Sequence, residues 1–151
     1  MKLQTSTMLA LYSVIEAASH PDRQVSAAEI AERYGVSAHH LAKVLRELGR
    51  AGLVDSSRGV GGGYRFSGNA RRLTLMDVIE RFEDIGVPTL EPGTSQTDVG
   101  AAIGRVLSEV DDIAKATFRS ITIDTLLKIV ERERQAQAAS AKTVAAASPD
   151  A

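Results

Sequence analysis

Two short stretches of the chain carry residues whose types and spacing suit recognition of an anion. In residues 37–46, a hydroxyl, two imidazoles and two cations occur as Ser37, His39, His40, Lys43 and Arg46. In residues 58–65, arginines flank a run of glycines, and the residues of interest are Arg58, Gly61, Gly62, Tyr64 and Arg65. Guanidinium and ammonium groups bind phosphate oxygens, and glycine lets a backbone come close to a ligand. Together the stretches predict binding to a polyanion, and double-stranded DNA is the one that we expect.

Other chemistries find little support in the sequence. The chain has no cysteine, which excludes disulfides, thiolate zinc sites and cysteine nucleophiles. His39 and His40 are adjacent, so on a helix they point about 100° apart and cannot share one metal ion. The glycine run breaks the G-x-G-x-x-G pattern of a nucleotide-binding loop at Tyr64, and no helix follows it directly. We therefore expect no enzyme activity, metal or cofactor, and we interpret Asp111 and Asp112 as solvated charges.

The first 51 residues carry the helical patterns that would position the first stretch. Apolar residues recur at helical spacing over residues 6–19, and Ser-Ala-Ala-Glu at the start of residues 26–34 is a capping-box pattern. Residues 35–37 then form a short turn that contains glycine. The next helix, over residues 38–51, has an inward face made of Leu41, Val44, Leu45 and Leu48. Two helices joined in this way are typical of a helix-turn-helix.

The second stretch lies in a predicted β-hairpin. Residues 53–57 and 64–67 have strand character on either side of the glycine run, so the run forms the tip of a two-stranded wing. A glycine-rich tip can enter a minor groove, with Arg58 and Arg65 beside it. An amphipathic helix over residues 75–85 follows.

The second half of the chain predicts a loop and two further helices. Residues 86–97 contain two prolines and two glycines without periodicity, which indicates a loop. The next helix begins at Asp98, and its apolar stripe follows a heptad pattern through Val99, Ile103, Val106, Val110, Ile113 and Thr117. This stripe predicts a dimer interface, and the alternative is that it belongs to the core of one chain. A short helix over residues 123–135 precedes a tail, residues 136–151, that we expect to be disordered.

Charge divides the chain at about its middle. Residues 1–75 carry ten lysines and arginines against six acidic residues, a net charge of +4, whereas residues 76–151 carry eight against thirteen, a net charge of −5. The basic half is therefore the predicted DNA-binding half, and Lys2, Arg71 and Arg72 add to its charge. No apolar stretch reaches the roughly 18 residues of a membrane helix, and the N-terminus has no signal-peptide pattern, so we expect a cytoplasmic protein without a membrane partner.

These motifs resemble one family of bacterial regulators. The resemblance covers about residues 1–130 and is carried by the turn sequence at 30–37, the run at 48–54, and above all the Arg-Gly-Val-Gly-Gly-Gly-Tyr sequence at 58–64 followed by residues 73–79. On these motifs the chain is identified as a member of the Rrf2 family. The implied fold is mainly α, a winged helix-turn-helix with a two-stranded β wing and a long C-terminal dimerisation helix.

The resemblance also implies a function. Family members are mostly repressors that bind imperfect palindromes as homodimers, with the helix of residues 38–51 in the major groove and the wing in the minor groove. The implied division is a DNA-binding domain over residues 1–85, an effector-type loop over 86–97, dimerisation helices over 98–135 and the tail. Better-known members hold an iron-sulfur cluster with three cysteines in that loop, and this chain has none. Its effector would be a protein, a small molecule or absent, and the alternative function is a dimeric interaction module that has lost specific operator binding.

Overall fold

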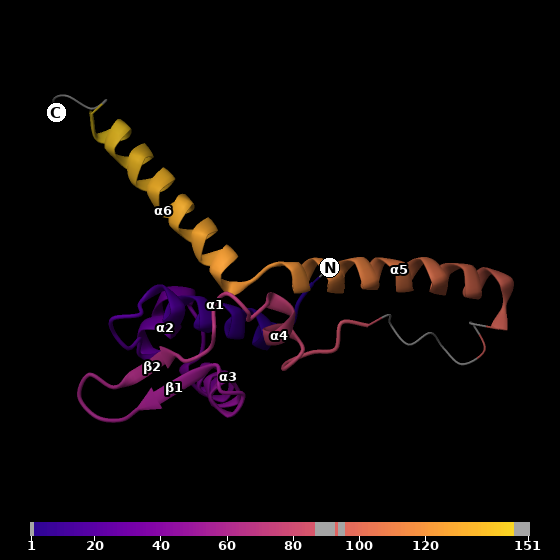
Figure 1. Cartoon of the computed structure of the whole chain (residues 1–151), viewed down its shortest axis with the longest axis horizontal. Helices are drawn as coiled ribbons and strands as arrows, with labels where there is room; N and C mark the ends of the chain where they lie inside the picture. Colours follow the sequence, from indigo (N-terminus) through magenta and orange to yellow (C-terminus); the bar gives the residue numbers. More distant parts are fainter. Residues whose placement is uncertain (1, 87–92, 94–95, 147–151) are drawn as a thin grey trace.

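A helical unit with a small sheet occupies the N-terminal part of the chain, and two long helices extend from it (Figure 1). The computed structural model describes residues 2–86, 93 and 96–146. The N-terminal unit contains α1 (Thr5–Ser19), α2 (Ala27–Tyr34), α3 (Ala38–Arg50), β1 (Val54–Ser57), β2 (Gly63–Phe66) and α4 (Leu75–Ile79). The long helices are α5 (Asp98–Ser120) and α6 (Ile123–Ala146). This order and arrangement confirm the predicted winged helix-turn-helix.

Local capping interactions fix the two helices of the helix-turn-helix. The Ser26 hydroxyl accepts a hydrogen bond from the Glu29 amide at 3.1 Å, and the Glu29 carboxylate accepts one from the Ser26 amide at 2.8 Å. This is the predicted capping box. Helix α2 ends at Gly35, whose φ of 61° is the left-handed conformation that glycine adopts without strain. Ser37 then caps α3 by accepting a hydrogen bond from the His40 amide.

Apolar side chains from all parts of the N-terminal unit form the core. The main cluster joins α1, α2, α3 and β1 to the start of α6, and includes Leu9, Val14, Ile30, Leu41, Leu45, Leu48, Val54 and Ile123. A smaller cluster contains Met76, Ile79 and Ile85, against which Leu3 and Phe118 pack. Since Phe118 belongs to α5 and Ile123 to α6, both long helices are anchored in the core of the N-terminal unit.

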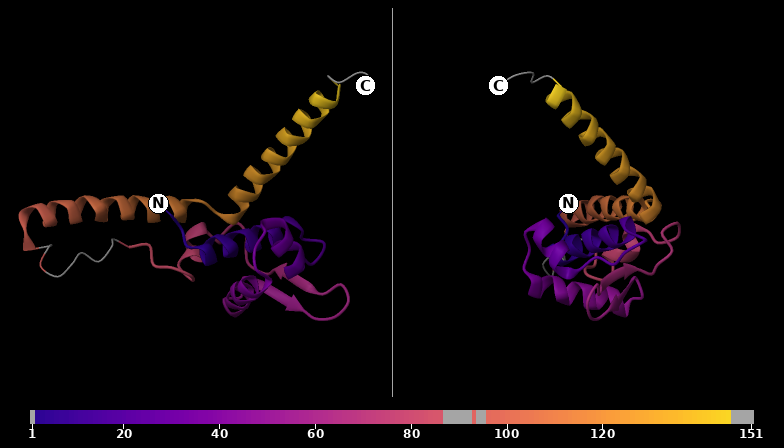
Figure 2. Two further views of the ribbon diagram at one scale, coloured as in Figure 1. Left: turned by 180° about the vertical axis from the view of Figure 1, so that it is seen from behind. Right: turned by 90° about the vertical axis from the view of Figure 1, so that its left-hand side faces the viewer.

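The junction between α5 and α6 pairs with the segment before α4. The Leu75 amide donates to the Ile121 carbonyl at 2.9 Å, and the Ile123 amide donates to the Leu73 carbonyl at 2.8 Å. Thr74 and Thr122 form an isolated antiparallel bridge between these segments. From this junction the two long helices run outward in different directions (Figure 2). None of the helices in the described residues combines the length and the apolar character needed to cross a membrane.

Two predicted helix boundaries are wrong. The helix predicted over residues 75–85 ends at Ile79, whose carbonyl accepts from the amides of both Phe82 and Glu83 in a tight turn. Acidic residues at 80, 83 and 84 disfavour a longer helix because they would face the negative end of its dipole.

The second wrong boundary is the start of the expected disordered tail. Helix α6 continues to Ala146, because the alanine-rich sequence after position 135 favours helix and Pro149 is the first proline to follow it. The end of the predicted tail, residues 147–151, lies outside the described residues. The same is true of most of the predicted loop over residues 86–97.

Candidate nucleic-acid interface

Helix α3 presents a cationic face on the side opposite the core. Leu41, Val44, Leu45 and Leu48 are at most 2 % exposed and pack inward as predicted. Four exposed side chains share the opposite face because they are spaced by four, three and four residues, and they are His39, Lys43, Arg46 and Arg50. Arg50 forms an ion pair with Glu47 at 2.8 Å, whereas Lys43 and Arg46 form none within the described part of the chain. Their charges are therefore available to a ligand.

His40 lies apart from this face. His40 is half-buried and lines a separate hollow together with residues 2–6, which include Lys2 and the first residues of α1. His40 is therefore partly covered, whereas His39 is exposed. The reason is the helical turn of about 100° between neighbours, which directs His40 toward the N-terminal segment.

The hairpin is fastened to the body of the unit by main-chain hydrogen bonds. Its register pairs Val54 with Phe66 and Ser57 with Gly63. The amide of Val25, just before α2, donates to the Tyr64 carbonyl at 2.9 Å, and the Tyr64 amide donates back to the Val25 carbonyl at 2.8 Å. The wing therefore has a third, one-residue strand, and its position follows that of the helix-turn-helix.

Gly63 is a structurally important residue that the sequence prediction missed. A Cβ atom at this position would lie 2.7 Å from the Val25 carbonyl oxygen, so only glycine lets β2 approach residue 25 this closely. Gly63 is the last of three consecutive glycines, and the sequence analysis named only the first two, Gly61 and Gly62, as site residues. Gly62 is also tightly placed, since its Cβ would lie 2.6 Å from the Ser57 carbonyl oxygen.

A groove runs between α3 and the hairpin and brings several predicted residues together. It is lined from α3 by Ala42, Leu45, Arg46 and Gly49, and from the hairpin by Val54, Asp55, Ser56, Ser57, Arg58, Gly63 and Tyr64. Arg46, Arg58 and Tyr64 of the predicted set thus share one concave surface. Tyr64 also packs against the main core, so it supports the base of the wing.

Arg65 is not among the residues that line this groove. It is exposed and stands opposite Asp55 in the register, and cross-strand partners project from the same face of a hairpin. Asp55 is an acidic member of the groove that the sequence prediction did not include. The charged residues that line the groove are therefore two arginines, Arg46 and Arg58, and one carboxylate, Asp55.

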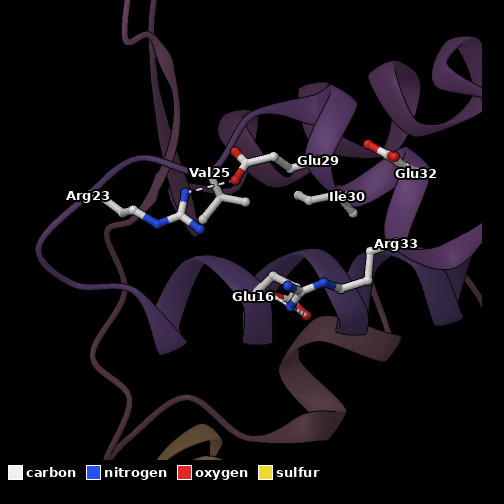
Figure 3. A pocket seen from close by; sticks show the side chains of 7 residues that line it. All are labelled: Glu16, Arg23, Val25, Glu29, Ile30, Glu32 and Arg33. Carbon is white, nitrogen blue, oxygen red and sulfur yellow. Dashed lines mark hydrogen bonds and ion pairs between the residues drawn. The ribbon is translucent and has the colours of Figure 1, made fainter.

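A second hollow, between α1 and α2, has a structural role (Figure 3). Arg33 donates to both carboxylate oxygens of Glu16, at 2.9 and 2.8 Å, and the Tyr34 hydroxyl donates to Glu16 at 2.6 Å. Burial alone would raise the pKa of Glu16, but these hydrogen bonds and the charge of Arg33 outweigh it, so that the pKa lies below its ordinary value. Burial and the bond to Glu16 raise the pKa of Tyr34. The buried carboxylate thus holds α2 against α1.

The predicted stripe along α5 is exposed in the single chain. Its five large apolar side chains, Val99, Ile103, Val106, Val110 and Ile113, are between 51 % and 70 % exposed. Thr117 is also exposed, and its hydroxyl donates to the Ile113 carbonyl at 2.9 Å. The alternative that this stripe forms the core of one chain therefore does not hold, and the stripe is open to a partner.

A helix-turn-helix followed by a two-stranded wing, with a cationic face on α3 where Lys43 and Arg46 have no ion-pair partner among the described residues, defines a winged-helix DNA-binding regulator of transcription. The sequence profile of the Rrf2 family, described as an iron-dependent transcriptional regulator, matches residues 3–129. The chain belongs to this family.

Individual relatives agree with this assignment. The protein named as the HTH-type transcriptional regulator BadM of Rhodopseudomonas palustris is 51 % identical over 135 residues, which cover 89 % of this chain and 86 % of the relative. CymR (YrzC), the global cysteine regulator of B. subtilis, superposes with a TM-score of 0.72 at 28 % identity over 85 % of this chain and 98 % of that one. IscR of T. potens gives 0.71 at 27 % identity over 88 % and 90 %. BadM and CymR are named as regulators, and none of the three relatives is named as an enzyme.

The iron in the family description does not match the residues of this chain. Thiolate ligands are absent because the sequence has no cysteine. Among the described residues, no three histidines, aspartates or glutamates are grouped so that they could hold a metal ion. The residues present therefore do not fit a resident iron-sulfur cluster, whose irons are held by thiolates, with histidine replacing two of them in one type.

Proposed function

We propose that this chain is a repressor that binds a palindromic operator in the cytoplasm as a homodimer. The observation that carries the proposal is that Lys43 and Arg46 lie on the exposed face of α3, that Arg46 also lines the groove with Arg58, and that none of the three has an ion-pair partner among the described residues. An unpaired cation on a recognition helix gains most from meeting phosphates or guanine edges.

Each part of the surface takes a separate role in this proposal. The outer face of α3, with Ser37 and His39 near its N-terminus, enters the major groove, and the N-terminus of this helix faces a phosphate. The wing tip, with Arg58 and the glycines, enters the neighbouring minor groove. Arg65 and Lys2 contact the phosphate backbone on either side.

The exposed stripe of α5 supports the homodimer. Apolar residues at heptad spacing over this length pair with an equivalent helix because pairing removes them from water. A second copy of the chain provides that helix, and a two-fold dimer presents two α3 helices to two half-sites of a palindrome.

Titration of labelled duplexes with the purified full-length chain tests the proposal. A duplex selected from a randomised pool should bind much more tightly than unrelated DNA. The Arg46→Ala variant should raise Kd roughly tenfold and, if Arg46 contacts a phosphate, reduce the salt slope by about 0.9. The matched control is Arg132→Ala, which removes the same exposed charge from α6 and should leave binding unchanged.

Two outcomes would contradict the proposal. If no duplex is enriched over random DNA while the chain is a stable dimer, the interaction-module alternative is favoured. If Arg46→Ala and Arg132→Ala weaken binding equally, the cations act through net charge and not through a recognition surface. Control of binding by an effector protein or a small molecule at the loop over residues 86–97 is a separate part of the proposal, tested by comparing operator affinity before and after replacement of that loop.

A further inference from the structure

The tip of the wing presents a single side chain. Residues 59–62 form a turn in which the Gly62 amide donates to the Gly59 carbonyl at 3.0 Å, and Gly61 has a φ of 74°. Val60 occupies the second position of this turn and is fully exposed. All other residues from 59 to 63 are glycines, so the isopropyl group of Val60 is the one side chain that this part of the wing offers.

The shape of this tip is fixed by its glycines. Gly62 cannot carry a Cβ because that atom would lie 2.6 Å from the Ser57 carbonyl oxygen and 2.9 Å from the Gly59 carbonyl oxygen. The left-handed conformation of Gly61 disfavours any other residue there as well. Val60 is therefore held at the apex of a narrow backbone, next to Arg58, which can bind the phosphates that border a groove.

An apolar group at this apex distinguishes base pairs in a minor groove. There, A·T and T·A pairs present only acceptors, whereas a G·C pair adds the exocyclic amino group of guanine, a hydrogen-bond donor that projects from the floor. An isopropyl group cannot accept that hydrogen bond, and it excludes the water that would. Burial of Val60 over guanine thus leaves a donor without a partner, which is costly, while burial over A·T costs much less.

We propose that Val60 is a specificity-determining residue that selects an A·T pair beneath the wing by rejecting the amino group of guanine. This inference rests on the proposed function, because it requires the wing to enter a minor groove. It assigns to the wing a direct contribution to sequence recognition, in addition to the charge that Arg58 contributes.

Base analogues combined with variants at position 60 test this assignment. The probe is the duplex selected from a randomised pool, in which each A·T pair of the wing-contacted segment, located by footprinting, is replaced by G·C or by inosine·C. Inosine·C has the major-groove face of G·C but lacks the amino group, so the comparison isolates that group. For the natural chain, G·C at one position should raise Kd about tenfold relative to inosine·C.

Two variants then connect this effect to Val60. Val60→Ala leaves room for the amino group, and Val60→Thr keeps the shape but supplies a hydroxyl that can accept its hydrogen bond. Both variants should reduce the G·C to inosine·C ratio to about twofold, and Val60→Ala should also weaken binding to the A·T duplex up to roughly tenfold through lost apolar burial. Gln137→Ala, at an exposed position of α6 outside the implied dimerisation helices, is the control and should change neither value.

The outcomes separate this inference from the function on which it rests. A ratio that both position-60 variants leave unchanged, or equal binding of G·C and inosine·C duplexes by the natural chain, would overturn the role of Val60 while leaving operator binding intact. Failure to enrich any duplex would overturn both. Unchanged thermal unfolding of the variants would verify that the fold is intact, as expected for a fully exposed side chain.

Discussion

Replacement of Gly63 by alanine should detach the wing from the helix-turn-helix. The added Cβ would lie 2.7 Å from the Val25 carbonyl oxygen and 2.9 Å from the Val25 carbonyl carbon, both of which are backbone atoms that cannot rotate away. Strand β2 must therefore move from residue 25. The two hydrogen bonds between Val25 and Tyr64, at 2.9 and 2.8 Å, depend on that distance and would be lost or lengthened.

The size of the effect follows from these two bonds. A backbone hydrogen bond contributes about 1 kcal/mol net, so Gly63→Ala should lower the free energy of unfolding by roughly 2 kcal/mol. For a chain of about 150 residues this corresponds to a fall in Tm of roughly 4–8 °C. Operator affinity should fall as well, because the groove wall that contains Arg58 and Tyr64 would shift relative to α3.

Thermal and urea unfolding of the full chain, followed by circular dichroism, measures this change. The control is Gly49→Ala in α3, where the nearest atom to a new Cβ is the Val54 carbonyl oxygen at 3.8 Å, an ordinary contact. Since alanine favours helix over glycine by up to about 1 kcal/mol, this control should be neutral or stabilising. If Gly63→Ala is as stable as the natural chain, or if Gly49→Ala is the less stable of the two, the close approach to Val25 does not fix the wing.

Further variants probe the dimer, the buried carboxylate and a helix cap. Val106→Asp in the α5 stripe should give a monomer by light scattering, whereas Ser108→Asp, on another face of the same helix, should stay dimeric. Glu16 has a lowered pKa in the folded state, so its stabilising effect is present above the ordinary pKa of a glutamate and is lost as pH falls through the lower value. Glu16→Gln should therefore be less stable than the natural chain at neutral pH, and urea unfolding should show this difference shrinking in acid; a constant difference would contradict the linkage. Ser26→Ala removes half of the capping box and should cost about 1 kcal/mol in urea unfolding, with no loss contradicting the role of the cap.

Local patterns allowed most of the fold to be predicted. The capping box at Ser26, the left-handed Gly35 and the cap at Ser37 act within a few residues of the chain, so the sequence contains all the information that they need. The inward face of α3 follows from periodicity for the same reason. The family motifs then place the hairpin and the long helices in the correct order.

The features that the sequence did not reveal depend on contacts between distant residues. Glycine is required at position 63 because the backbone of residue 25 lies against it. No local sequence pattern predicts this contact. His40 is partly covered because it lies beside the distant segment of residues 2–6. Helix α4 ends before residue 85, and the acidic residues at 80, 83 and 84 are a local signal of this early end. The sequence prediction gave more weight to the apolar periodicity, which continues to residue 85.

The rigid attachment of α5 has a consequence for the geometry of the operator. Three backbone hydrogen bonds join residues 70–75 to residues 121–124. Rotation of α5 would therefore rotate the N-terminal unit as well. With 23 residues, α5 is about 34 Å long, comparable to one turn of B-form DNA. In the proposed dimer α5 therefore sets the separation and orientation of the two N-terminal units. One residue inserted into α5 would rotate an N-terminal unit by about 100° and misalign it with its half-site.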